Sequence, residues 1–187
     1  MSGPAPREAW RRALHLLSGT LALAAFLPAA IVPWGFAALL AAALALEAAR
    51  LAAPPGGPPL GPGVGAMFRP GEARGLSGAS LLAVGYAAVF LAFPGSAAAR
   101  AVLVTATADP AAAAAGTLLG RATGHKTWVG TGAAFSTAAL VLLLTRVPAV
   151  PALAAAAAAA AAERLPWRGA DNVAIPLATA AVLRLLG

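Results

Sequence analysis

Residues 107–130 read TADPAAAAAGTLLGRATGHKTWVG, and the rest of the chain is organised around them. The stretch places one acid, Asp109, in an apolar run and closes with a short basic loop that contains Lys126. An ionised carboxylate in such surroundings is costly, so it is by default a candidate functional group. On a helix, Asp109, Ala112, Gly116 and Gly120 share a face with little side-chain bulk. This face predicts a groove about 16 Å long that leads from a buried acid to a cationic mouth.

The composition indicates an integral membrane protein. Of the 187 residues, 60% are hydrophobic and 10% are charged, and the mean hydropathy is +0.82. A soluble domain of this composition would lack the polar residues needed to cover its surface. The 13 Lys and Arg against 6 Asp and Glu are expected to orient the chain and to meet anionic lipid or phosphate, not nucleic acid. Because there is no cysteine, disulfides and thiolate metal sites are excluded.

We expect a single all-α transmembrane domain over residues 1–187, with about seven helices. The expected spans are residues 13–31, 34–51, 76–93, 97–119, 128–144, 149–162 and 171–186. The fourth is predicted to break at Asp109-Pro110. A basic, partly disordered lead (1–12) precedes the spans, and a Pro/Gly-rich loop (54–75) separates the second from the third. The first span also fits a cleaved signal peptide, although His15 is unusual in such a segment.

The cationic residues indicate the orientation in the membrane. With the N-terminus in the cytosol, ten of them fall on the cytosolic side: Arg7, Arg11, Arg12, Arg50, Arg69, Arg74, Arg121, Lys126, Arg164 and Arg168. Arg100, Arg146 and Arg184 fall on the other side. The positive-inside rule therefore predicts a cytosolic N-terminus, an external C-terminus and a candidate site that faces the cytosol from the cytoplasmic membrane.

Two motifs in the central stretch have a structural as well as a functional interpretation. Asp109-Pro110 is a good helix start, so it is either an N-cap or an opening whose free N–H groups suit phosphate. Gly116 and Gly120 either let two helices pack closely or let a ligand approach the backbone.

The basic loop from Gly120 to Thr127 superficially resembles a P-loop but fails its spacing, and no strand precedes it. Arg121 and Lys126 beside flexible glycines such as Gly124 still suit a polyphosphate. The alternative is a loop whose charges only set the topology.

Four other polar residues near the expected cytosolic side complete the set. Asp171 and Asn172 begin the last span, either as an N-cap or, with Glu163 and Asp109, as oxygen ligands for Mg²⁺. His15 is either a packed, hydrogen-bonded histidine or a catalytic group.

Five pieces of the sequence together resemble the family of dolichol kinases, phytol kinases and CTP-dependent diacylglycerol kinases. In chain order they are Arg12 with His15 and Gly19; Glu47 with Arg50; Arg69 and Glu72 before Leu76-Ser77-Gly78-Ala79; the run Asp109-Pro110, Gly116, Gly120-Arg121, Gly124, Lys126-Thr127 and Gly130; and Asp171-Asn172 with Pro176-Leu177. Each piece alone is weak, whereas their order and spacing over most of the chain are fairly specific. One departure is the short basic loop, which has a single lysine where relatives often carry more.

The resemblance implies phosphoryl transfer from a nucleoside triphosphate, typically CTP, to the hydroxyl of a lipid alcohol, with Mg²⁺. It also implies that the nucleotide site includes Gly116, Gly120, Arg121, Gly124, Lys126, Thr127, Gly130 and Asn172. Asp109 is either the general base or a metal ligand. Related membrane cytidylyltransferases, which make CDP-lipids, are an alternative, and a non-catalytic transporter is another. The lipid and the oligomeric state stay open, a homodimer included.

Overall fold

The computed structural model describes residues 6–53, 72, 75–93, 95–119, 126–166 and 169–187. In this part of the chain all regular secondary structure is helical, without a strand. The elements are α1 (Pro6–Ser18), the 3₁₀ helix η1 (Gly19–Phe26), α2 (Val32–Ala52), α4 (Gly78–Ala92), α5 (Gly95–Leu118), α6 (Trp128–Leu144), α7 (Ala149–Glu163) and α8 (Asp171–Leu186). The predicted all-α fold is therefore confirmed. Arg69, Gly120, Arg121 and Gly124 lie outside the described residues, as does most of the loop 54–75.

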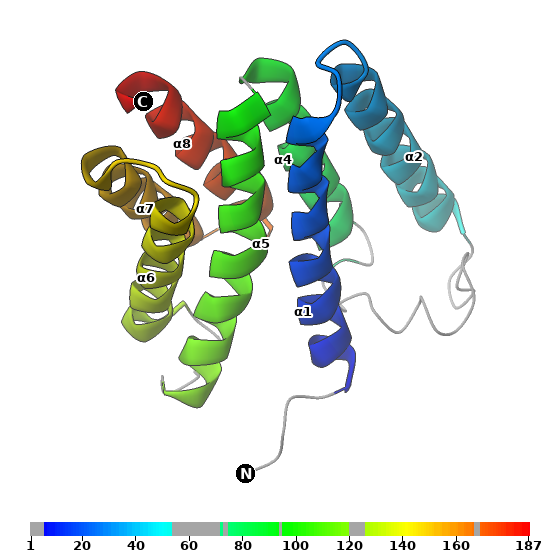
Figure 1. Cartoon of the computed structure of the whole chain (residues 1–187). Coiled ribbons are helices and arrows are strands. Elements are labelled where there is room, and N and C mark those ends of the chain that lie inside the picture. The colour runs from blue at the N-terminus through cyan, green and yellow to red at the C-terminus, as the bar shows by residue number, and fades with distance from the viewer. Residues whose placement is uncertain (1–5, 54–71, 73–74, 94, 120–125, 167–168) are drawn as a thin grey trace.

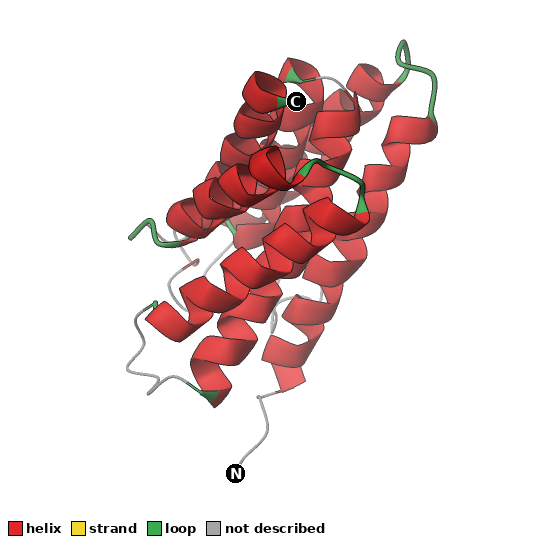
Figure 2. Ribbon diagram, turned by 60° about the vertical axis from the view of Figure 1, so that its left-hand side comes forward, coloured by secondary structure: helices red, strands yellow, loops and turns green. Residues whose placement is uncertain are grey.

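The helices form one elongated bundle in which the chain reverses direction at successive connections (Figures 1 and 2). In Figure 1, α1 and η1 follow one another as a continuous rod, and the start of α1 and the C-terminus lie at opposite ends of the bundle. One end gathers the N-terminal ends of α1, α4, α6 and α8 with the C-terminal ends of α2, α5 and α7. We call it the polar end, because most of the charged side chains described below lie there.

Two helices in the described part are long and apolar enough to cross a membrane, by length and composition alone: α2 and α5. Three further apolar helices, α4, α6 and α7, are shorter. The helices nevertheless lie where the apolar runs predict them, and the bounds of α6 and α8 coincide with those of the expected spans. The lead differs from the prediction, because α1 already begins at Pro6. Proline suits the first turn of a helix, and the Arg, Glu and Ala residues that follow favour its continuation.

The expected break at Asp109-Pro110 is wrong: α5 runs without interruption through Pro110. Proline removes one backbone hydrogen bond and crowds the preceding turn. Here the surrounding sequence is largely alanine, the best helix former, and Pro110 is buried within the bundle. Packing against neighbouring helices keeps the helical path, as it does for proline in many membrane helices. Asp109 therefore lies in mid-helix and does not serve as an N-cap.

Two apolar clusters make the core, and α5 contributes to both. One joins α5 to α6, α7 and α8, with Val104, Leu142 and Ile175 at its centre. The other joins α5 to η1, α2, α4 and α8 around Tyr86 and Val102. The helix that contains Asp109 is therefore the central helix of the fold, although most of its core residues precede residue 107.

The alanine run of α7, expected to be buried among neighbouring helices, is buried along one face only. Ala155, Ala156 and Ala159 are fully buried, whereas Ala157 and Ala161 are exposed. The run therefore packs against the bundle on one side and leaves its other side open.

Candidate functional site

His15, in the last turn of α1, and Asp109, in the interior of α5, face each other. His15 Nδ1 lies 3.7 Å from Asp109 Oδ2, and the Asp109 side chain is 29% exposed. The other ring nitrogen of His15, Nε2, lies 3.2 Å from the carbonyl oxygen of Thr105. Because a carbonyl can only accept, Nε2 carries the hydrogen in this bond. Nδ1 therefore faces Asp109, as an acceptor in the neutral ring or as a donor in the protonated ring.

Lys126, just before α6, joins the ends of two other helices. Its ammonium lies 3.0 Å from Asp171 Oδ2 at the start of α8 and 3.6 Å from Glu163 Oε1 at the end of α7. It also donates to the backbone carbonyl of Glu163. Glu163 is buried, and its other oxygen, Oε2, accepts from the hydroxyl of Thr131 at 3.2 Å. The Lys126 ammonium is therefore surrounded by oxygen atoms of Glu163 and Asp171.

The two groups lie within electrostatic range of each other, because the charges of Asp171, Lys126 and Glu163 reach the Asp109 carboxyl. His15 and Asp171, which are 156 positions apart in the sequence, are thus brought into one region of the bundle. Asp171 occupies the first turn of α8, where Ala170 is the N-cap residue. Its Oδ2 accepts from the Lys126 ammonium, and its Oδ1 accepts from the backbone amide of Asn172 at 3.0 Å. Asp171 therefore satisfies a free N–H group at the start of α8, as the structural alternative expects, and also contacts the cation.

These acids suit a divalent metal by their chemistry. Asp109, Glu163 and Asp171 offer only carboxylate oxygens, the donors that Mg²⁺ prefers. The Lys126 ammonium already occupies a cation position between Glu163 and Asp171. Within the described residues, no group of three His, Cys, Asp or Glu side chains is close enough to form a ready metal centre. The donor set therefore fits Mg²⁺ if Lys126 and Asp109 rearrange.

A second polar cluster lies between α2 and α4. Both Glu47 oxygens are occupied: Arg50 donates at 2.6 and 3.2 Å, the Ser77 amide at 2.7 Å and the Ser80 hydroxyl at 3.0 Å. Ser77 is also the N-cap of α4. A buried carboxylate with this many donors fixes the helix ends rather than reacting. Glu47 therefore has a structural role.

Glu72 links this cluster to α1 and α8. Its Oε1 accepts from the Gly78 amide at 3.3 Å and lies 3.7 Å from an Arg11 nitrogen. Asn172 donates from Nδ2 to the Gly78 carbonyl at 3.1 Å. Asn172, expected at the nucleotide, thus ties the start of α8 to the start of α4. This contact fixes the position of the neighbouring Asp171.

Of the glycines and threonine expected at the nucleotide, the described ones lie at the contact between α5 and α6: Gly116, Gly130 and Thr127. A Cβ at Gly130 would be 2.8 Å from the carbonyl oxygen of Ala112, and one at Gly116 would be 3.0 Å from the Thr127 hydroxyl. Thr127 is the N-cap of α6 and accepts from the Gly130 amide at 3.0 Å. The observed role of these residues is close helix packing, the structural alternative for Gly116.

Two threonines that contact the candidate site residues could not be recognised from the sequence. Thr131 bonds Glu163, and the Thr105 carbonyl fixes the His15 ring, yet single threonines in apolar helices are usually unremarkable. The expected candidate Arg12 has a buried Nε without a hydrogen-bond partner among the described residues. Comparisons with protein-family models, with curated proteins and with solved structures found no match for this chain.

Proposed function

We propose that this chain is an integral membrane lipid kinase. It transfers the γ-phosphate of a nucleoside triphosphate, CTP by its family resemblance, to the hydroxyl of a lipid or isoprenoid alcohol. The observation that carries the proposal is the pair of His15 and Asp109 inside an apolar helical bundle, with the group of Lys126, Glu163 and Asp171 within electrostatic range of it. Phosphoryl transfer needs a group that positions the attacking hydroxyl and charges that stabilise the phosphates. Asp109 with His15 suits the first need, and the lysine with the two other acids suits the second.

The apolar surface supports the membrane part of the proposal. Large hydrophobic side chains such as Phe26, Trp34 and Leu144 are exposed on the bundle, at 85%, 76% and 72%. Patches of this kind need a partner other than water. We propose that the helices cross the cytoplasmic membrane in seven passes, with α1 and η1 as the first and the polar end in the cytosol. The shorter helices can span the membrane because the charged residues that flank them extend into the membrane–water interfaces.

Asp109 is the general base in the proposed reaction. The lipid alcohol enters sideways between helices and places its hydroxyl beside the Asp109 carboxylate. Asp109 accepts the hydroxyl proton while the alcohol oxygen bonds to the γ-phosphorus, and the bond from that phosphorus to the β–γ bridging oxygen breaks. The nucleoside diphosphate leaves with the electron pair of the broken bond. His15 Nδ1 lies where it can take the proton onward from Asp109.

Lys126 binds the polyphosphate in this proposal. Its side chain is only 31% exposed and held by Glu163 and Asp171, so a phosphate would draw it away from these acids. The released carboxylates would then hold Mg²⁺, which supplies charge neutralisation for the transferring phosphate. Mg²⁺ would thereby take the place of the Lys126 ammonium between the carboxylates of Glu163 and Asp171.

An assay with position-specific labels tests the proposal. The purified full-length chain in detergent is incubated with Mg²⁺, a panel of lipid alcohols or of lipid phosphates, and CTP labelled at either the γ- or the α-phosphate. With the alcohols we expect labelled lipid phosphate from the γ-label alone. Transfer from the α-label to a lipid phosphate would instead identify a cytidylyltransferase. If neither label reaches lipid, the kinase proposal fails.

A further inference from the structure

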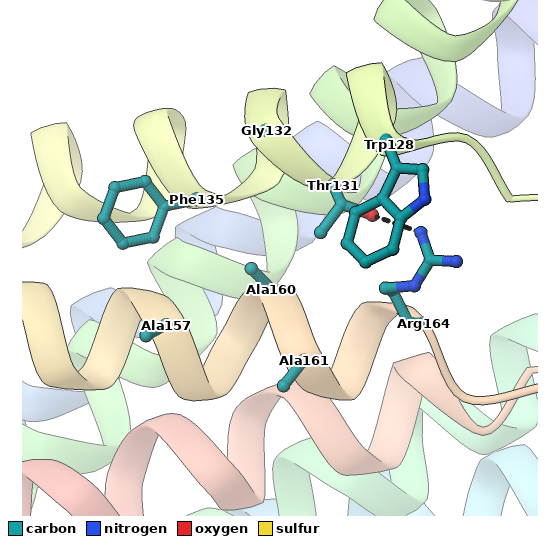
Figure 3. A pocket seen from close by; sticks show the side chains of 8 residues that line it. All are labelled: Trp128, Thr131, Gly132, Phe135, Ala157, Ala160, Ala161 and Arg164. Carbon is teal, nitrogen blue, oxygen red and sulfur yellow. Dashed lines mark hydrogen bonds between the residues drawn. The ribbon is translucent and has the colours of Figure 1, made fainter.

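A shallow groove runs along the outer side of α6 and α7, away from the Asp109 site (Figure 3). Its volume is about 550 Å³, within the range of sites for small ligands. Apolar or small residues line most of its length: Gly132, Phe135, Ala157, Ala160 and Ala161. The open face of the α7 alanine run forms one wall.

The groove has a cationic end. The Arg164 guanidinium stacks over the Trp128 ring, with its carbon 3.9 Å from the ring centroid. Its Nη1 donates to the Thr131 hydroxyl at 3.1 Å. Figure 3 shows these three side chains together at one end, with Phe135 at the other. Trp128 is the first residue of α6 and Arg164 follows α7, so this end of the groove coincides with the polar end of the bundle.

We propose that this groove binds an anionic glycerophospholipid of the surrounding bilayer, with one acyl chain along α6 and α7 and the phosphate on Arg164. Charge complementarity identifies the occupant: among the described residues that line the groove, the charged one is Arg164, a cation at the level where lipid phosphates lie. Exposed tryptophan is typical of the same membrane–water interface, and Trp128 is 76% exposed. Because Gly132 has no Cβ, the groove leaves room at this position for an acyl chain.

The site is coupled to the candidate active site through Thr131. Its hydroxyl accepts from Arg164 and donates to Glu163, whose other oxygen lies beside Lys126. A lipid phosphate that binds Arg164 would therefore alter the hydrogen-bond network of Thr131 and Glu163, which also contacts Lys126. This inference uses the proposed membrane location but does not depend on kinase chemistry.

Native mass spectrometry of the purified full chain in a neutral detergent tests the site, with phosphatidylglycerol or phosphatidylcholine as added probes. We expect preferential binding of one phosphatidylglycerol. Gly132→Leu places a side chain in the groove, and its Cβ would have nothing within 4 Å. Gly35→Leu on α2 is the matched control, since a Cβ there also meets open space.

Arg164→Gln tests the headgroup contact, with Arg184→Gln as the charge-matched control at the far end of α8. Gly132→Leu should abolish the preference, and Arg164→Gln should weaken it about fivefold. Arg164→Lys should restore part of it, and both controls should behave as the unaltered protein. Unchanged phosphatidylglycerol binding in Gly132→Leu would overturn the proposal. A change of oligomeric state in that variant would also overturn it, because the groove would then be a subunit interface. If the unaltered protein binds phosphatidylglycerol but transfers no phosphate to lipid, only the proposed catalytic function fails.

Discussion

Asp109 differs from asparagine by one charge and almost nothing in shape, so Asp109→Asn isolates what the charge does. Because α5 is continuous, this side chain caps no helix start, and the substitution removes no cap. We expect kcat to fall by roughly 10²-fold or more, since the variant can neither accept the hydroxyl proton nor bind a metal as an anion. Thermal stability in detergent should stay the same or rise, because a charge at this depth is costly.

The same variant separates the two possible roles of Asp109. A lost base leaves the Mg²⁺ dependence unchanged and flattens the acid limb of the pH–rate profile. A lost ligand shifts the Mg²⁺ requirement upward and is partly rescued at high concentration. The measurement is kcat across Mg²⁺ concentration and pH. Near-normal turnover in a stable variant would exclude Asp109 from the chemistry.

Lys126 is the second residue with a distinct prediction. Lys126→Ala should raise the KM for the nucleotide and lower kcat, while the KM for the lipid changes little. The ligand-free variant should melt at a lower temperature, because Glu163 and Asp171 lose their shared counter-ion. Added Mg²⁺ should then stabilise the variant more than the unaltered protein, since the freed carboxylates can bind it.

Arg184→Ala is the matched control for Lys126, because it removes a cation at the opposite end of the bundle. It should leave both the nucleotide kinetics and the response to Mg²⁺ unchanged. If Lys126→Ala melts earlier but retains normal nucleotide kinetics, then Lys126 is only a structural counter-ion.

At the scale of elements, the contact between α4 and α8 positions the site. A Cβ at Gly85 would overlap the carbonyl oxygen of Asn172. Gly85→Ala must therefore push the start of α8 away from α4, and Asp171 moves with it. We expect a loss of about 1–3 kcal/mol in the free energy of unfolding, with reduced kcat. Gly35→Ala is the control, and equal behaviour of the two variants in thermal melts and turnover would refute this positioning role.

The elements were largely predictable, whereas their contacts were not. The bounds of α6 and α8 follow from apolar runs between proline- and glycine-rich connections. The path of α5 through Pro110 was missed, because local preference favours a helix start there and only tertiary packing overrides it. The same limit applies to the site. His15 and Asp109 were recognisable as unusual polar residues, but the capture of Lys126 by Glu163 and Asp171 depends on how three helix ends meet.

At the scale of the whole molecule, charge is distributed unevenly along the bundle. Arg11, Arg50, Lys126 and Arg164 lie at or near the polar end, together with acids from several helices. Toward the opposite end, Arg100 donates to the carbonyl of Thr145 at 3.1 Å, and Arg146 and Arg184 lie close to helix ends. This asymmetry is what the positive-inside rule requires if the polar end faces the cytosol.

The proposed topology is tested by the accessibility of tags in intact cells. Tags at the N-terminus and in the loop 54–75 should report the cytosol, and a tag after Gly187 should report the opposite side, because an odd number of passes separates the two termini. Each tagged protein must retain the turnover of the untagged one, so that misfolded chains are not scored. A cytosolic C-terminal tag in an active protein would mean an even number of passes. At least one of the shorter helices would then fail to cross, and the C-terminal part of the bundle, with Asp171 on α8, would need a different placement relative to the membrane.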